Sequence, residues 1–118
     1  MTDAVLFDAR DDGIAIITLN RPEARNALGT DIRTGLFAAW DRFEHDPALR
    51  IAILTGSGDK AFCAGGDLKE MVERGLTVPP RDMFPVPGDT IELSKPTIAA
   101  VNGVAFAGGW MIAQACDL

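Results

Sequence analysis

Two glycine-containing segments have residue types and positions suited to holding a negatively charged oxygen with backbone groups. They are residues 62–68 (FCAGGDL) and residues 102–109 (NGVAFAGG). Each follows an apolar run and precedes a helical pattern. Glycine lets the backbone approach a ligand closely, and the first N–H groups of a helix have no partner within it. Because the helix dipole favours negative charge there, two such turns brought together could direct N–H groups at one developing oxyanion.

Packing alone also explains this composition. Glycine and alanine let a helix lie close to a sheet, and glycine-rich turns between strands and helices are common. The residues by themselves leave both explanations open for each turn.

The elements that would position these turns are predicted from apolar patterning. Strands are predicted at residues 14–19, 51–55 and 97–101, and the second is apolar throughout, as expected of a strand covered on both faces. A helix capped by Thr30 or Asp31 and ending before Pro47 would bury a stripe formed by Ile32, Leu36, Ala39, Trp40 and Phe43. Further helices are predicted at about residues 67–75 and at residues 110–116.

Strands therefore alternate with helices, which favours an α/β fold with parallel pairing, because the connections are too long for simple hairpins. The prolines between residues 79 and 87 predict a surface loop. No repeat is evident in the sequence. The chain stops at Leu118, where another strand could begin, so we expect a sequence that has been cut short.

Composition indicates one globular domain in the cytoplasm. The 118 residues are 47% hydrophobic and 24% charged, with a net charge of -6. That acidic balance argues against a nucleic-acid partner and against a polybasic membrane surface. Cys63 and Cys116 form no C-x-x-C pair, so reduced thiols are expected. The N-terminus lacks the features of a signal peptide, and no apolar run is long enough to cross a bilayer.

Three strings, found in order and covering nearly the whole chain, resemble the enoyl-CoA hydratase/isomerase (crotonase) family. They are NRP…NAL in residues 20–28, FCAGGDL in residues 62–68 and KP…VNG…GG in residues 95–109. The resemblance implies a crotonase-like α/β spiral of ββα units, of which residues 1–118 would be the N-terminal portion of a single domain, incomplete at the C-terminus. It also implies trimers or hexamers, acyl-CoA thioester substrates, and no cofactor besides the coenzyme A carried by the substrate.

The resemblance also assigns roles to individual residues. By motif position, Gly66 and Gly108 supply the two backbone N–H groups of an oxyanion hole, and are the expected catalytic residues. The residues expected to bind the substrate beside the CoA portion are Arg25, Ala27, Ala64, Gly65, Asp67 and Leu68. Arg25 could pair with a CoA phosphate, although a solvated side chain is the simpler explanation.

One position departs from the pattern of the family's hydratases. Those enzymes use two glutamates, and the first stands three residues after the glycine matched by Gly108, where this chain has Met111. A thioether cannot accept a proton as a carboxylate does. We therefore expect Met111 to fill the core or, with Phe106 and Trp110, to line an acyl pocket. The second glutamate would lie beyond Leu118, and members with that carboxylate alone resemble enoyl-CoA isomerases.

The other candidates have simpler explanations. We expect His45 to lie near a helix end, Cys63 to be a small buried residue, and Asp67 to cap the helix that it begins.

Two alternative functions remain. Residues 56–61 (GSGDKA) match the G-x-G-x-x-A dinucleotide fingerprint of a nicotinamide-dependent oxidoreductase, although the helix is expected only from Asp67. A non-catalytic paralogue that keeps the scaffold is the other alternative, and Met111 supports it.

Overall fold

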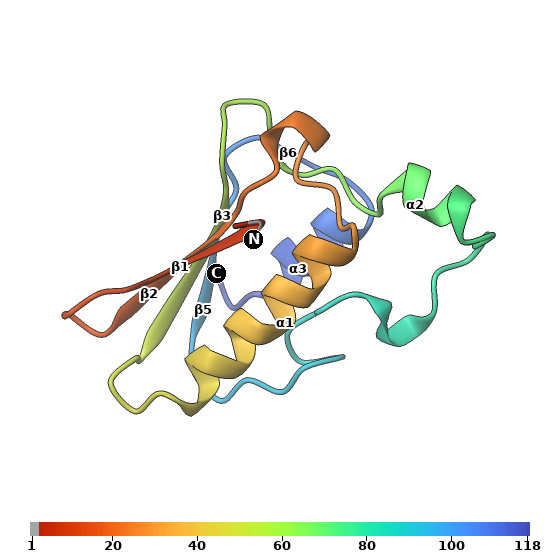
Figure 1. Cartoon of the computed structure of the whole chain (residues 1–118). Helices are drawn as coiled ribbons and strands as arrows, with labels where there is room; N and C mark the ends of the chain where they lie inside the picture. The colour runs from red at the N-terminus through yellow and green to blue at the C-terminus, as the bar shows by residue number, and fades with distance from the viewer. Residues whose placement is uncertain (1–2) are drawn as a thin grey trace.

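In the computed structural model, which describes residues 3–118, two strands and one helix follow one another three times (Figure 1). The first unit contains β1 (Val5–Ala9), β2 (Ile14–Leu19) and α1 (Thr30–His45). The second unit contains β3 (Ile51–Gly56), β4 (Ala61–Cys63) and α2 (Leu68–Glu73). The third unit contains β5 (Thr97–Ala100), β6 (Val104–Ala105) and α3 (Gly108–Ala115). Two short 3-10 helices, η1 (Pro22–Ala24) and η2 (Arg81–Met83), lie in the connections. The chain is thus built from the ββα units that the resemblance implied.

The strands form two sheets. β1, β2, β3 and β5 make a four-stranded sheet in that order, and β4 pairs with β6 in a second sheet. The β2–β3 and β3–β5 pairs are parallel, as the alternation of strands and helices predicted. Strand β1 was not predicted, and it joins β2 through an antiparallel hairpin, so the expectation that hairpins are absent is wrong there.

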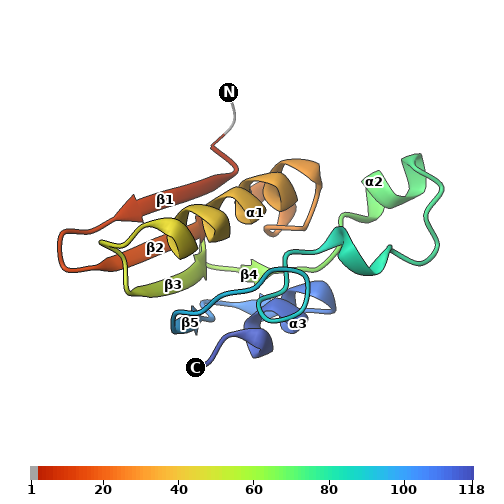
Figure 2. The ribbon, with the colours of Figure 1, turned by 90° about the horizontal axis from the view of Figure 1, so that it is seen from below.

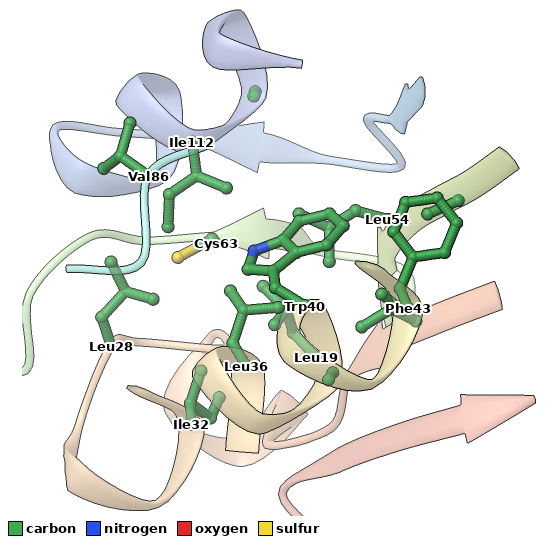
Figure 3. Close-up of a cluster of buried hydrophobic side chains, with 14 of the residues drawn as sticks. Leu19, Leu28, Ile32, Leu36, Trp40, Phe43, Leu54, Cys63, Val86 and Ile112 are labelled. Carbon is green, nitrogen blue, oxygen red and sulfur yellow. The ribbon is translucent and has the colours of Figure 1, made fainter. Parts of the chain in front are cut away.

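Helix α1 lies along one face of the larger sheet and supplies the two largest fully buried side chains, Trp40 and Phe43. All five residues of its predicted stripe are buried. Figure 3 shows Ile32, Leu36, Trp40 and Phe43 gathered with side chains from the strands and from α3. Complete burial of one large apolar side chain contributes roughly 1.5–3 kcal/mol to the stability of the fold. The buried stripe therefore stabilises the packing of α1 against the sheet.

Two expectations about these elements need correction. The N-cap of α1 is Gly29, which has no side chain to offer, so the predicted capping by Thr30 or Asp31 is wrong. Strand β3 alternates in burial, with Ala52 and Leu54 in the core and Ile53 only half-buried on the opposite face. Its apolar run is therefore not covered on both sides within residues 3–118.

The proline-rich segment is not simply a surface loop. Residues 84–87 are buried, and Phe84 and Val86 belong to the main core. The Thr90 hydroxyl holds this turn, since it accepts a hydrogen bond from the Val86 N–H and donates one to the Phe84 carbonyl. The segment therefore returns from α2 to the core before it continues to β5.

Residues 56–61 do not open a helix as the dinucleotide fingerprint requires. Strand β3 ends at Gly56, and strand β4 begins at Ala61. A pyrophosphate would find no helix N-terminus there, so the nicotinamide interpretation is wrong.

Three glycines allow the second and third units to meet. A Cβ atom at Gly109 would lie 2.2 Å from the Cys63 carbonyl oxygen, and one at Gly103 would lie 2.6 Å from the Lys60 carbonyl oxygen. A Cβ atom at Gly65 would lie 2.9 Å from the Phe106 carbonyl oxygen. Real Cβ atoms do not come so close to backbone oxygens, so no side chain fits at these points.

No helix in the described part of the chain is long and apolar enough to cross a bilayer. Met1 and Thr2 lie outside the described residues. They belong to the N-terminal segment that lacks the features of a signal peptide.

The substitution Gly109→Ala tests this packing. The added methyl group collides with backbone rather than with a flexible side chain, so we expect the free energy of unfolding to fall by about 3 kcal/mol or more. Gly88→Ala is the control, because nothing lies within 4 Å of its Cβ position and only its φ of 81° is unfavourable, which costs about 1 kcal/mol. The measurement is the denaturant midpoint, and equal losses in the two variants would contradict the steric argument.

Candidate active site at two glycine turns

The two glycine turns lie against each other because the strands that precede them are paired. β4 and β6 run parallel, with Cys63 opposite Ala105. The first turn follows β4, and the second leads from β6 into α3. A Cβ atom at Gly65 would lie only 3.5 Å from the Gly108 nitrogen, which places the turns in contact.

Gly66 and Gly108 carry backbone N–H groups that donate to nothing within residues 3–118. Gly108 is the first residue of α3, so its N–H has no acceptor in the helix. One aromatic ring lies beside both glycines, since Phe84 ring atoms would be 3.5 Å from a Cβ atom on either. Two free donors next to an apolar wall are the arrangement that an oxyanion hole requires. Their role as donors to a substrate stays a prediction.

Ala107, immediately before α3, has a backbone conformation that L residues rarely adopt. Its φ is 47° and its ψ is -116°. Strained residues of this kind cluster at functional sites, where the surrounding structure holds them in place. No sequence pattern pointed to Ala107, because alanine ordinarily avoids positive φ.

A groove of about 730 Å³ begins at the first glycine turn and runs along the segment after β2. Six predicted site residues line it, namely Arg25, Ala27, Ala64, Gly66, Asp67 and Leu68, together with Arg21, Glu23, Ala24, Lys69 and Ala107, which were not predicted. Gly65, Gly108 and Met111 are not among the residues that line it. Three cationic side chains and two carboxylates line the groove, and the Arg21 Nε lies 3.6 Å from the Glu23 Oε1.

Asn26 holds the chain segment that lines this groove, and its hydrogen bonds were not predicted from the sequence. It is fully buried and has a φ of 55°, a left-handed conformation that asparagine tolerates. Its side-chain amide donates to the carbonyl oxygens of Ser57 and Ala61, each at 3.1 Å, and its Oδ1 accepts from the Arg21 N–H at 2.8 Å. The resemblance had placed Asn26 in the NAL string, next to residues expected beside the CoA portion, but it gave no indication of these buried partners.

The apolar residues around α3 are more exposed than predicted. Met111 is 42% exposed, Trp110 53% and Phe106 60%. The expectation that Met111 fills the core is therefore wrong, because α3 buries its opposite side, with Ile112 inside (Figure 3). A role for these three side chains beside an acyl group stays a prediction.

Three secondary expectations are confirmed. Asp67 is the N-cap of α2, and its carboxylate accepts from the Glu70 N–H at 3.2 Å. His45 is exposed in the last turn of α1. Cys63 is buried, and burial raises the pKa of its thiol to about 11, so it remains protonated at neutral pH.

Comparison with known proteins places this geometry in context. The sequence model of the enoyl-CoA hydratase/isomerase family matches residues 9–118. The (E)-benzylidenesuccinyl-CoA hydratase of Thauera aromatica is 44% identical over 108 residues, which are 89% of this chain and 42% of the relative. Enoyl-CoA hydratase EchA19 of Mycobacterium tuberculosis is 45% identical over 113 residues, covering 87% of this chain and 41% of the relative.

Solved structures give the same result. A crystal structure of enoyl-CoA hydratase from Mycobacterium tuberculosis H37Rv superposes with a TM-score of 0.82 at 43% identity. The match covers 99% of this chain and 45% of that structure. The chain therefore spans less than half the length of the proteins that it matches.

Asn26→Asp tests whether the amide supports the groove. Aspartate keeps the size of the side chain and tolerates the left-handed backbone, but it presents oxygen to two carbonyl oxygens in place of an N–H donor. We expect the free energy of unfolding to fall by about 3 kcal/mol, because buried acceptors would face one another. Asn20→Asp, at a half-buried position, should change stability by less than about 1 kcal/mol. Similar small changes in both variants, measured by urea unfolding, would contradict the role of Asn26.

Proposed function

Because the chain belongs to the enoyl-CoA hydratase/isomerase family, we propose that the protein binds an acyl-CoA thioester and stabilises its enolate between Gly66 and Gly108. The observation that carries the proposal is the pair of free N–H groups on two glycine turns in contact. The thioester oxygen would accept both hydrogen bonds. As a proton leaves the α-carbon, or a nucleophile adds at the β-carbon, negative charge grows on that oxygen and the two donors stabilise it.

Electrostatics and burial support this assignment. Gly108 begins α3, so the positive end of the helix dipole adds to its N–H. Phe84 and Leu28 lie beside Gly108 and would keep water away, which strengthens each donor. Loss of one oxyanion donor costs about 3–4 kcal/mol of transition-state stabilisation in enzymes that use such a site.

The groove beside the turns is the proposed site for the CoA portion. Arg21, Arg25 and Lys69 could pair with phosphate oxygens there, while the thioester end reaches Gly66. No other cofactor is needed for this chemistry, because the thioester itself acidifies the α-carbon.

Met111 decides which reaction of the family we propose. A side chain that cannot hold or deprotonate water replaces one carboxylate of the hydratases, and its apolar bulk would exclude that water. We propose that double-bond isomerisation, or another enolate reaction with one base, is faster than hydration. The base would belong to the half of the relatives' length that this chain does not span. A non-catalytic scaffold is the second candidate, which retained thioester binding without any turnover would favour.

We also propose a cytoplasmic location and assembly into a trimer or hexamer. Two buried free cysteines agree with a reducing compartment. Exposed apolar side chains near α3, among them Trp110 and Phe106, agree with a surface that is covered on assembly.

Calorimetric titration tests the proposed ligand. Crotonyl-CoA should bind at least about tenfold more tightly than free crotonate, because recognition is proposed to rest on the CoA portion and the thioester carbonyl. Coenzyme A alone serves as the control for the groove and should compete with the thioester. Crotonate that binds as tightly as its thioester would contradict the proposal.

Met111→Glu tests the proposed reaction. A carboxylate at this position should raise the rate of hydration of crotonyl-CoA about tenfold or more, since a general base contributes roughly 100- to 10,000-fold when well placed. Met111→Gln is the matched control, being of similar size without a basic group. The rates to compare are those of 3-hydroxyacyl-CoA formation and of 3-enoyl to 2-enoyl conversion. Fast hydration by the unmodified protein would overturn the preference for one-base chemistry.

A further inference from the structure

Glu70, on the first turn of α2, reaches across to the start of α1, forty residues earlier in the chain. Its Oε2 accepts a hydrogen bond from the Thr30 N–H at 2.9 Å, and its Oε1 accepts from the Thr30 hydroxyl. Arg33 completes the contact, donating to Oε1 at 3.0 Å and to the Leu28 carbonyl at 2.7 Å. One carboxylate thus joins two helices.

The start of α1 needs this carboxylate. Its N-cap, Gly29, offers no side-chain acceptor, so Glu70 supplies the acceptor that a capping residue ordinarily provides. Burial would by itself raise the pKa of Glu70, but the hydrogen bonds from Thr30 and Arg33 outweigh it and hold the pKa at about 2. The group is therefore an anion throughout the physiological range, as the positive end of a helix favours.

The close approach of the two helices depends on Gly29. A Cβ atom there would lie 3.0 Å from an Asp67 carboxylate oxygen and 3.1 Å from the Glu70 Oε2. Asp67 directly follows Gly66 and caps α2. The start of α2, which directly follows the first glycine turn, therefore packs against the start of α1.

Apolar packing does little to hold α2. None of its residues is buried, and Leu68 and Val72 are 75% and 78% exposed. Figures 1 and 2 show α2 projecting from the body of the protein. Backbone hydrogen bonds hold the glycine turn before α2, since the Ala64 N–H donates to the Arg25 carbonyl at 3.0 Å and the Leu28 N–H donates to the Gly65 carbonyl at 2.7 Å. The contact of Glu70 with Thr30 and Arg33 connects α2 itself to the start of α1.

We propose that Glu70 is a positioning residue that, by joining α2 to the start of α1, holds the Gly65–Gly66 turn so that the Gly66 N–H stays directed at the thioester oxygen. This inference rests on the proposed function, since it concerns the same oxyanion hole. Glu70 does not contact the substrate in it. Displacement of one donor by about 1 Å can lower catalysis by up to about a hundredfold without abolishing binding.

The test compares Glu70→Ala with Glu73→Ala, which removes an exposed carboxylate from the same helix. In the whole protein, Glu70→Ala should lower kcat for enoyl-CoA isomerisation about tenfold or more, while the dissociation constant of the thioester changes less than about threefold. Amide hydrogen exchange in α2 and at Thr30 should speed up in the same variant. Glu73→Ala should match the wild-type protein in kcat, in the dissociation constant of the thioester and in amide exchange. Glu70→Gln keeps an acceptor oxygen and should recover part of the kcat that Glu70→Ala loses.

The outcomes separate this proposal from the proposed function. Wild-type protein that neither binds nor converts an enoyl-CoA would overturn the function, and the positioning role with it. Wild-type turnover with unchanged kcat in Glu70→Ala would overturn the positioning role alone, even if exchange in α2 becomes faster. Unchanged exchange in α2 would also overturn it, because the contact would then not be holding the helix.

Discussion

The site depends on the close approach of two backbones, which glycine alone permits. Gly65, Gly103 and Gly109 lie so near to carbonyl oxygens of the facing segment that any side chain would displace it. That approach lets β4 and β6 pair and brings into contact the two turns that carry the free N–H groups of Gly66 and Gly108. The proposed oxyanion donors are backbone atoms, so packing, and not the identity of a catalytic side chain, would set the geometry that holds the charge.

Polar side chains hold this backbone from outside the site. The Ala61 carbonyl accepts from the amides of both Asn26 and Asn102, which fixes the turn between β3 and β4 from two sides. The Glu70 carboxylate joins α2, which follows the first glycine turn, to the start of α1. Each such hydrogen bond contributes only about 1 kcal/mol to stability. A conformation that left one of these buried groups unpaired would cost more, so the contacts mainly determine where the backbone lies.

Sequence reasoning succeeded where structure is local or where a motif carries the information. The spacing of apolar residues identified α1 and its buried stripe, and three strings identified the family. It missed β4 and β6, which are too short to show alternation, and β1, a five-residue run in which Asp8 interrupts the apolar residues. The hydrogen bonds of Asn26 and Glu70 could not be predicted, because their partners lie 31 to 40 residues away. The alternative that Met111 fills the core was wrong, since an all-apolar helix predicts burial and cannot show which side remains open.

The vibrational frequency of the bound thioester carbonyl measures the central feature most directly. Infrared difference spectra of crotonyl-CoA, with and without ¹³C at the carbonyl, isolate that stretch in the complex with the whole protein. Two N–H donors would pull electron density toward oxygen, so a clear shift to lower wavenumber on binding is expected. Gly108→Val, which crowds the second donor, should reduce the shift. A bound carbonyl that absorbs at the frequency of the free thioester in water, or higher, would contradict an oxyanion hole at Gly66 and Gly108.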